Sequence, residues 1–465
     1  MENALSQQPS LVTQNLVQKA LQHHQMGQFA EAEQIYQQAL AIDPHHPDAL
    51  HLMGMIAYQT GRADAAIEFI RRAIAIKADA ASYHSNLGNV LQSQGHLAEA
   101  GACYQRALLL KPDLPEVHLN LGNIFKAQGD VDSSLACSRR ALALNPDSAE
   151  AAVAESMALL LKGDFACGWP NFERRWQTKD YDTQMRPYAQ PLWKGEQLAS
   201  GRLLIWGEQG IGDEIMFAGL ISDVVRTGNR CILDCDARLQ PLFSRSFPGV
   251  DVVAGVDPAN HPEFDIAAHL PSGSLPDLFR TSTAAFAATT SPYLVADLTT
   301  QRRFRARYDD GRKLVGLAWH TKNKKTGRSR SIDPQLLSPL FARPGIRWIS
   351  LQYGAHVALN EQAAAANAPI LIDREVDQLA NLDEFAAQIA AMDLVITIDN
   401  STAHLAGALG VPTWVLLPFA PDWRWLLNCE NSPWYPTMRL FRQRELSNWD
   451  PVVREIEIAL EQDAT

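Results

Sequence analysis

The sequence predicts an α + α/β protein in which an array of helical repeats precedes two α/β domains with parallel sheets. Three observations support this prediction. Glycines recur every 34 residues near the N-terminus, short apolar runs alternate with helical patterns from Arg202 onward, and all eleven tryptophans lie between Trp169 and Trp449. A chain of 465 residues has room for about three domains.

The N-terminal repeats have the 34-residue period of tetratricopeptide (TPR) repeats, each of which is a pair of helices. The glycines that mark the period are Gly27, Gly61, Gly95 and Gly129. Five residues after each glycine comes a small residue, namely Ala32, Ala66, Ala100 and Ser134. Residues 1–162 are therefore predicted to form a TPR superhelix of four repeats.

Residues 163–198 are predicted to be a degenerate capping repeat and a linker. Gly163 keeps the register of the array, but Gly168 and Arg175 stand where the pattern requires its small residues. Terminal units of a repeat array are commonly atypical, because they close its apolar core.

Two α/β domains are expected next, over residues 199–310 and 311–465. Apolar runs such as "RCILDC" and "LVITID" alternate with helical patterns, which is typical of βαβ units and parallel sheets. The stretch from 281 to 313 interrupts this alternation with small, polar and then charged residues. We expect it to connect two Rossmann-like halves with a cleft between them.

Charge and composition exclude several classes of protein. A formal net charge of -11 argues against general binding to nucleic acids or membrane surfaces. The six cysteines are scattered without the spacing of a disulfide framework or a metal site. No apolar run is long enough to span a membrane and the first residues do not resemble a signal peptide, so a cytoplasmic location is expected.

In "VITIDNSTAHLAGALGVP" a buried apolar strand ends in a polar cluster, and a helix of small residues follows. Ligands of open α/β sheets collect beyond the carboxyl ends of strands, and unpaired N–H groups at a helix start attract phosphate. The candidate ligand-binding residues here are Asp399, Asn400, Ser401, Thr402 and His404. The alternative is an ordinary core helix that Asn400 or Ser401 caps.

A basic loop follows another expected strand, "LVGLAW". It contains His320, Lys322, Lys324, Lys325, Arg328 and Arg330. Such side chains suit a diphosphate and its developing charge, and we favour Lys325, Arg328 and Arg330 as ligands. The alternative is a solvated loop, which is the commoner fate of a charge run.

A glycine loop follows the first strand of the other half, in "WGEQGIGDEIMF". Gly207, Gly210 and Gly212 do not have the dinucleotide-binding spacing, and they indicate backbone that approaches a ligand closely. Asp213 is the candidate general base toward an acceptor hydroxyl. The alternative is that Asp213 only favours the helix start through its charge.

These motifs together resemble glycosyltransferases of the GT-B fold, specifically the ADP-heptose:lipopolysaccharide heptosyltransferase family and its TPR-linked bacterial relatives. The resemblance extends over "GDFACGWPNFERRW", "GEQGIGDEIMF", "RSRSI", "SLQYG", "DNSTAHLAGALGVPTWVLLP", "PDWRWLL" and "SPWYPTMRLFRQ". It implies donor contacts by Asp399, Ser401 and His404, with Asn400 standing where the family usually has Thr.

The same resemblance implies that Asp213 is the base and that Gln352 lies near the nucleotide. It further implies that the nucleotide sugar is a substrate, that no cofactor is needed and that transfer is metal-independent.

The repeats have a resemblance of their own. "NLGN" occurs at matching positions in the third and fourth repeats and places Asn86 and Asn120 on their first helices. This is similar to protein O-GlcNAc transferase, in which asparagines hold the acceptor peptide by its backbone. The alternative is that both are ordinary exposed polar residues of a repeat helix.

The main hypothesis is a glycosyltransferase that moves a sugar from a nucleotide donor to a protein that the repeats recruit. TPR-linked enzymes that glycosylate flagellin are the nearest functional analogy. The expected partners are a protein acceptor in the TPR groove and the nucleotide sugar, with no nucleic acid and no membrane span. The alternatives are a TPR adaptor with a non-catalytic glycosyltransferase-like module, and a lipopolysaccharide heptosyltransferase.

Overall fold

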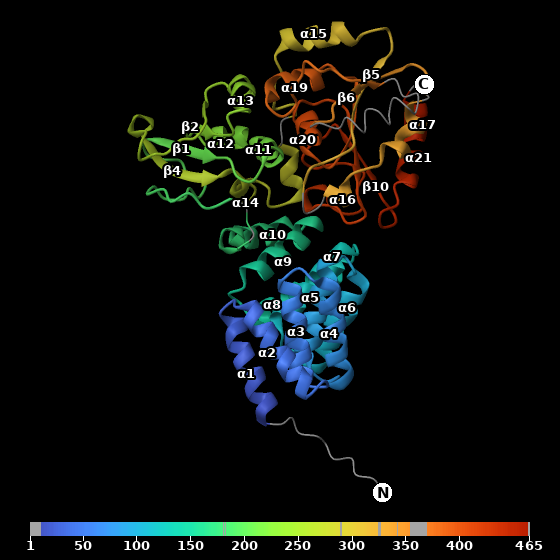
Figure 1. Ribbon diagram of the computed structural model, residues 1–465. Helices are drawn as coiled ribbons and strands as arrows, with labels where there is room; N and C mark the ends of the chain where they lie inside the picture. The colour runs from blue at the N-terminus through green and yellow to red at the C-terminus, as the bar shows by residue number, and fades with distance from the viewer. Residues whose placement is uncertain are drawn as a thin grey trace. The chain divides into compact units, whose positions relative to one another are not determined.

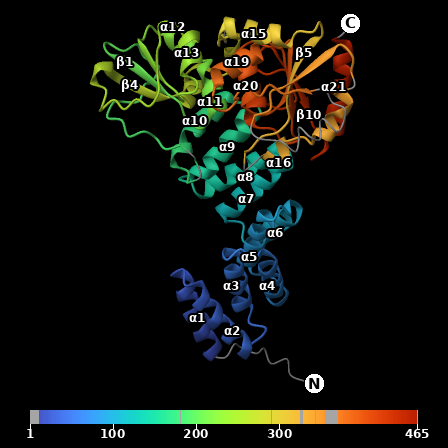
Figure 2. The same cartoon turned by 45° about the horizontal axis from the view of Figure 1, so that its top comes forward.

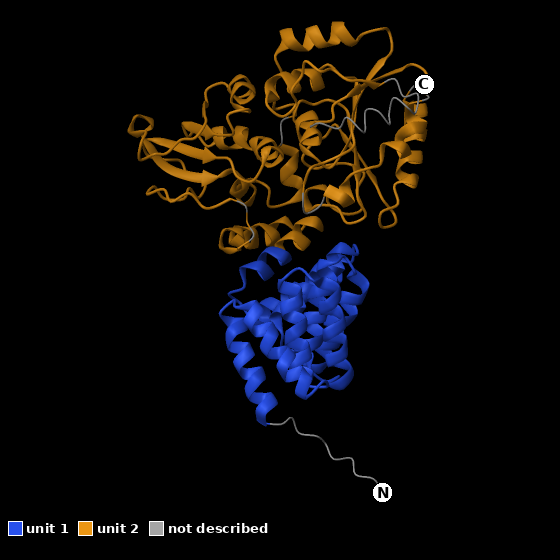
Figure 3. Cartoon of the chain, viewed as in Figure 1, with its two compact units in different colours: residues 1–155 blue, residues 156–465 orange. Residues whose placement is uncertain are grey.

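The computed structural model describes residues 11–179, 181, 183–288, 291–323, 327–341, 343–353 and 370–463. It divides into two compact units, residues 1–155 and residues 156–465, which are blue and orange in Figure 3.

Unit 1 is built from helices that pair in chain order (Figure 1). These helices are α1 (Leu11–Gln25), α2 (Phe29–Ile42), α3 (Pro47–Gln59), α4 (Ala63–Ile76), α5 (Ala81–Ser93), α6 (Leu97–Leu110), α7 (Pro115–Ala127) and α8 (Val131–Leu144). A further helix, α9 (Ala149–Leu161), begins in unit 1 and ends in unit 2. The helix pairs confirm the predicted repeat period.

The repeating glycines make the turn between the two helices of a pair. Gly61 and Gly95, for example, have φ angles of 80°, in the left-handed region that side chains with a Cβ rarely adopt. The small residues of the pattern lie in the core of the unit, and Ala32, Ala66 and Ala100 have no exposed surface. The large apolar positions pack around them.

Unit 2 contains a first sheet of four parallel strands in the order β3-β2-β1-β4. These strands are β1 (Arg202–Trp206), β2 (Cys231–Asp234), β3 (Asp251–Val253) and β4 (Ile266–Pro271). The helices of this half are α11 (Ile211–Ala218), α12 (Ile221–Arg226), α13 (Gln240–Ser246) and α14 (Leu275–Phe279).

The second sheet of unit 2 has six parallel strands in the order β10-β9-β8-β5-β6-β7. These strands are β5 (Lys313–Ala318), β6 (Ile346–Ser350), β7 (Ile370–Leu371), β8 (Leu394–Ile398), β9 (Thr413–Leu417) and β10 (Met438–Arg442). The accompanying helices are α15 (Leu298–Tyr308), α16 (Gly327–Arg330), α17 (Ser338–Phe341), α19 (Leu382–Ala390), α20 (Ser401–Ala408) and α21 (Asp450–Gln462).

The strands match the apolar runs of the sequence, with one exception. Every residue of β8 and β9 is buried, as expected for strands covered on both faces. The pattern did not predict β10, because Arg439 and Arg442 interrupt its apolar residues. The parallel α/β part that the sequence predicts is confirmed.

The order of the second sheet reverses between β5 and β8, because the chain moves outward from β5 to β7 and then returns to β8. Such a reversal leaves a crevice beyond the carboxyl ends of the two strands, where ligands of open α/β sheets bind. Helix α20 follows β8 at this point and packs against α11 of the first half (Figure 2).

The segment after Gly163 packs within unit 2. Helix α10 (Phe165–Phe172) places Trp169 among the rings of Trp423 and Trp434, and the Trp169 Nε1 donates a 2.8 Å hydrogen bond to the Arg280 carbonyl. Unit 2 therefore includes these residues in its aromatic core.

Candidate functional site

Unit 2 contains a cleft of about 410 Å³ beyond the carboxyl ends of β1, β5, β6, β8 and β9. Both halves of the unit contribute to it. Its lining residues are Gln209, Ile211, Gly212, Asp213, Thr321, Asn323, Arg330, Tyr353, Asp399, Asn400, Ser401, His404, Asp422 and Arg424. All three sequence motifs with candidate site residues, those after β1, β5 and β8, thus contribute several residues to one cleft.

The polar cluster after β8 caps helix α20. The Asn400 side chain accepts a hydrogen bond of 3.2 Å from the Ala403 N–H and another of 3.1 Å from the Thr397 hydroxyl. Asn400, and not Ser401, is therefore the cap. Ser401 lines the cleft at the first turn of α20, whereas Thr402 is fully buried and lies outside the lining.

His404 faces the cleft from within α20 and is only 5% exposed. Its ring stacks on Trp425, and its Nδ1 lies 2.9 Å from the Tyr435 hydroxyl. Burial lowers the pKa of His404 to about 3, and the positive charge of Arg424 acts in the same direction. The imidazole is thus neutral near pH 7, so it can exchange hydrogen bonds with a ligand but adds no charge.

Asp213 forms an ion pair with Arg424, a residue of the opposite half. Arg424 also holds Asp422 at 2.6 Å, and Asp422 in turn lies 3.7 Å from Arg330. Arg330 pairs with Asp399 at 3.1 Å. The five charged side chains form a continuous network along the cleft.

The network changes the acidity of its carboxyl groups. Burial raises the pKa of Asp213, and the Arg424 charge opposes that rise. Burial also acts against the charged form of Asp422, but Arg424 and Arg330 together hold its pKa at about 2. Asp422 therefore stays ionised and anchors both guanidinium groups.

The glycines after β1 allow close packing. A Cβ on Gly212 would come within 3.1 Å of the His404 Cδ2, so this glycine lets α11 approach α20. A Cβ on Gly207 would lie 2.5 Å from the carboxyl carbon of Glu214. At Gly210 a Cβ would meet nothing closer than 3.9 Å. Two of the three glycines are therefore explained by contacts inside the protein.

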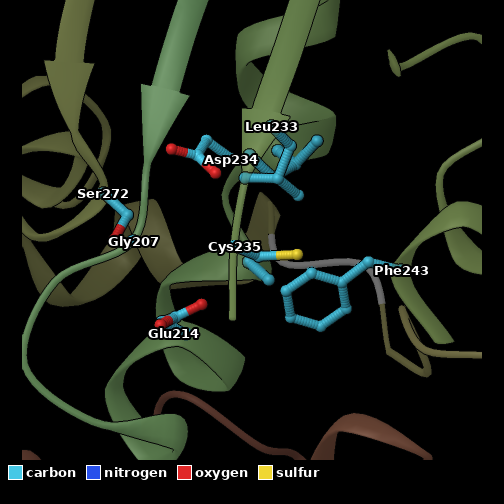
Figure 4. Close-up of a pocket in the computed structure, with 9 residues that line it drawn as sticks. Gly207, Glu214, Leu233, Asp234, Cys235, Phe243 and Ser272 are labelled. Carbon is cyan, nitrogen blue, oxygen red and sulfur yellow. The ribbon is translucent and has the colours of Figure 1, made fainter. Parts of the chain in front are cut away.

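Glu214 lines a second, small cavity at the end of β1, of about 10 Å³, with Gly207, Asp234, Cys235 and Ser272 around it (Figure 4). Its carboxylate accepts a 2.9 Å hydrogen bond from the Asp236 N–H. Burial raises the pKa of Glu214 to about 7. A space of this size holds one water molecule at most.

A buried ion pair supports the loop between β1 and α11. Arg175 binds both carboxylate oxygens of Glu208, at 3.0 and 2.8 Å, and neither side chain is exposed. Glu208 also accepts a 2.8 Å hydrogen bond from the Gly273 N–H. The next residue, Gln209, has a φ of 63°. Its N–H donates a 2.8 Å hydrogen bond to the Thr183 hydroxyl, and its side-chain amide donates one to the Tyr181 hydroxyl. Arg175 thus departs from the repeat pattern because it binds Glu208.

Some of the predicted ligands that the structure describes do not line the cleft. Lys325 falls outside the described residues. Arg328 is exposed and His320 is half-buried, and neither lines the cleft. Arg330 is the one residue of the favoured basic set that does so within the described part of the loop.

Gln352 forms hydrogen bonds with the main chain near the ends of β5 and β6. Its side-chain oxygen accepts hydrogen bonds from the Trp319 and His320 N–H groups at 2.9 and 2.8 Å. Its nitrogen donates to the carbonyls of His320 and Tyr353 at 3.0 and 3.1 Å. The amide thereby fixes the loop after β5, and a contact with nucleotide stays a prediction.

Sequence reasoning assigned no role to several residues that line the cleft. Arg424 and Asp422 are the main ones, and both lie in "PDWRWLL" after β9. The others are Gln209, Ile211, Thr321, Asn323 and Tyr353. Asp422 and Arg424 could have been predicted, because an acidic and a basic residue stand together in an aromatic stretch just after a strand.

Asn86 and Asn120 lie in unit 1, on α5 and α7. The Asn86 Nδ2 is 2.8 Å from the His51 Nε2, and the Asn120 Nδ2 donates a 3.0 Å hydrogen bond to the Asn89 Oδ1. Each amide is half-buried and bridges to the first helix of the preceding repeat.

Comparisons with known proteins agree with the helical part of the chain. Tetratricopeptide repeat families match residues 23–89 and 119–166, and a TPR repeat family matches residues 92–129. Protein FlbA of Caulobacter vibrioides is 32% identical over 331 residues, which cover 66% of this chain and 54% of FlbA. The match thus spans about half the length of that relative. Because it covers more of the chain than the repeats occupy, the similarity extends into the α/β part.

Solved structures that resemble the chain include two bacterial proteins. Pseudomonas aeruginosa pilF is 18% identical, with a TM-score of 0.36 over 47% of this chain and 86% of pilF. The thermophilic TPR protein TTC0263 of Thermus thermophilus is 20% identical, with a TM-score of 0.30 over 37% of this chain and 93% of that protein.

Two further features concern the described residues. None of their helices combines the length and apolar character that crossing a membrane requires. In the same part of the chain, no three His, Cys, Asp or Glu side chains are grouped as a metal site would need.

The N-terminal part of the chain consists of tetratricopeptide repeats, which indicate a role in binding protein, and an α/β part with parallel sheets follows it.

Proposed function

We propose that unit 2 is a glycosyltransferase that moves a sugar from a nucleotide donor to a protein, and that the repeats of unit 1 recruit this acceptor. The observation that carries the proposal is the cleft at the reversal between β5 and β8, with a helix N-terminus, two arginines and a carboxylate from the opposite half in its lining.

The α20 side of the cleft suits the phosphates of the donor. The first N–H groups of a helix and its dipole favour an anion, and Ser401 adds a hydroxyl at that end. Arg330 and Arg424 lie in the same cleft and provide donors that match phosphate oxygens in pairs. Neutral His404 completes this side as a hydrogen-bonding group.

Asp213 faces these groups from the other half and is proposed as the general base. It would take the proton of the acceptor hydroxyl while the acceptor oxygen bonds to the anomeric carbon. The bond from that carbon to the phosphate oxygen breaks, and the nucleoside diphosphate leaves with the electron pair. The arginines would stabilise its charge. A base of this kind contributes about 10²–10⁴-fold to a rate.

The repeats supply the acceptor in this proposal. Asn86 and Asn120 belong to successive repeats, and an amide can both donate to and accept from a peptide bond. An extended segment of the acceptor, which the flagellin analogy suggests as one class, would bind along these helices. The donor side of the reaction does not depend on this contact.

Two measurements test the proposal. Purified protein is heated with UDP, GDP, ADP, CMP and their sugars, because a ligand that binds only the native state raises the melting temperature. We expect one nucleotide to raise it. No shift with any of them, with candidate acceptors also present, would favour an adaptor in which the α/β part is not catalytic.

Transfer is then measured in Asp213→Asn, which keeps the shape of the side chain but not its basicity. We expect the rate to fall by roughly a hundredfold or more. Asp251→Asn removes the carboxylate from an Asp–Arg pair outside the cleft, with Arg202, and should retain transfer. Equal rates in both variants would exclude Asp213 as the base.

A further inference from the structure

Two residues next to Arg424 in the chain and one residue from the opposite half of unit 2 hold its guanidinium in place. Its Nη1 binds Asp422 at 2.6 Å, and its guanidinium carbon lies 4.4 Å from the centre of the Trp423 ring. Its Nη2 binds Asp213, which belongs to the opposite half of unit 2. Asp422 and Trp423, which adjoin Arg424 in the chain, therefore anchor the guanidinium, whereas Asp213 binds it from the opposite half.

We infer that Arg424 exchanges Asp213 for a phosphate group of the donor, so that donor binding releases the base for the acceptor hydroxyl. This inference rests on the proposed function and adds a binding residue and an order of events to it. It predicts that the nucleoside diphosphate moiety and Asp213 compete for the same guanidinium nitrogen.

The charges of the cleft favour such an exchange when a diphosphate binds. Asp213, Asp399 and Asp422 outnumber Arg330 and Arg424 among the described lining residues. Both arginines are already paired with carboxylates. A diphosphate that entered an unchanged network would meet a surplus of negative charge, and taking over Arg424 relieves this repulsion.

The exchange also removes an obstacle to catalysis. A carboxylate that shares its charge with a guanidinium is a weaker base than a free one, because the ion pair stabilises the deprotonated form. Once phosphate binds Arg424, Asp213 loses this stabilisation and its proton affinity rises. The donor is thus expected to bind before the acceptor is activated.

A double-mutant cycle tests the competition. Full-length wild type, Asp213→Asn, Arg424→Gln and the double variant are titrated calorimetrically with UDP, GDP, ADP, CDP and inorganic pyrophosphate. The cycle uses the probe that binds the wild type most tightly. Intrinsic tryptophan fluorescence on heating checks that each variant folds, since all eleven tryptophans lie in unit 2.

We expect Asp213→Asn to bind the probe about fivefold more tightly, because the competing ion pair is gone. Arg424→Gln should weaken binding by about tenfold or more. In the double variant the Asp213→Asn gain should vanish, so that its affinity equals that of Arg424→Gln. The matched variant Asp251→Asn should bind as the wild type does.

Each contrary result has one meaning. If Asp213→Asn binds the probe more tightly even without Arg424, the effect is general electrostatic repulsion and the exchange is wrong. If the wild type binds but Asp213→Asn does not change its affinity, the exchange fails while the proposed function stands. If no probe binds the wild type, both fail.

Discussion

Gly212 of α11 packs directly against His404 of α20, where a Cβ would make an unusually tight contact. A Cβ there would come within 3.1 Å of the His404 Cδ2 and 3.7 Å of the Ser401 Cα. Both partners line the cleft, so the glycine sets the distance between the two halves at the point where the donor is proposed to bind.

Gly212→Ala is expected to push α11 and α20 apart and to weaken nucleotide binding. Overpacking of a close contact costs about 1–3 kcal/mol. Calorimetric titration and thermal unfolding measure both effects. Gly210→Ala is the matched control, because a Cβ there meets nothing closer than 3.9 Å. Equal losses in the two variants would mean that the contact with His404 is unimportant.

Arg175→Met is expected to destabilise unit 2 by about 3–5 kcal/mol, because it leaves the buried Glu208 carboxylate without its counter-charge. Denaturant unfolding followed by tryptophan fluorescence gives the free energy. Adding Glu208→Gln to the variant should recover part of the loss. Arg202→Met breaks a surface pair with Asp251 and should cost less than about 1 kcal/mol.

Glu214→Gln is expected to stabilise unit 2 above pH 7 and to make little difference near pH 5. Burial raises the pKa of Glu214 from 4.5 to about 7 in the folded protein. Between these values the unfolded chain has released a proton that the folded protein keeps, so wild-type stability falls as the pH rises. Unfolding at pH 5 and pH 8 measures the difference, and a gain at pH 5 equal to that at pH 8 would contradict this cause.

Gly95→Ala is expected to destabilise unit 1 by about 1 kcal/mol through backbone conformation alone. Gly95 has a φ of 80°, and a Cβ there would meet nothing within 4 Å. Circular dichroism during thermal unfolding follows this helical unit. Gly101→Ala, inside α6, meets only an ordinary contact of 3.4 Å and should stabilise the helix. A stabilised Gly95→Ala would show that the turn is not strained.

Much of the fold could be predicted because its signals are local. The period of Gly61 and Gly95 records a turn that each repeat needs, whichever partners surround it. The runs that form β5 and β8 are apolar because parallel strands are covered on both faces. β10 was missed because its arginines hide that pattern.

The site was predicted only in part, because a sequence gives the place of a residue and not the direction of its side chain. Arg328 and Arg330 are two positions apart, yet one is exposed and the other lines the cleft. Gln352 follows β6, and only the structure shows that its amide forms hydrogen bonds with the main chain.

The sequence alone determined that helical repeats precede an α/β part, and that the polar residues after β1 and β8 lie where ligands of such sheets collect. These features depend on spacing along the chain. Only the tertiary structure decided that Asp213 faces Arg424 and that Arg175 reaches Glu208. The partners in these pairs lie 211 and 33 positions apart, and folding brings them together because a buried charge needs a counter-charge wherever the chain provides one.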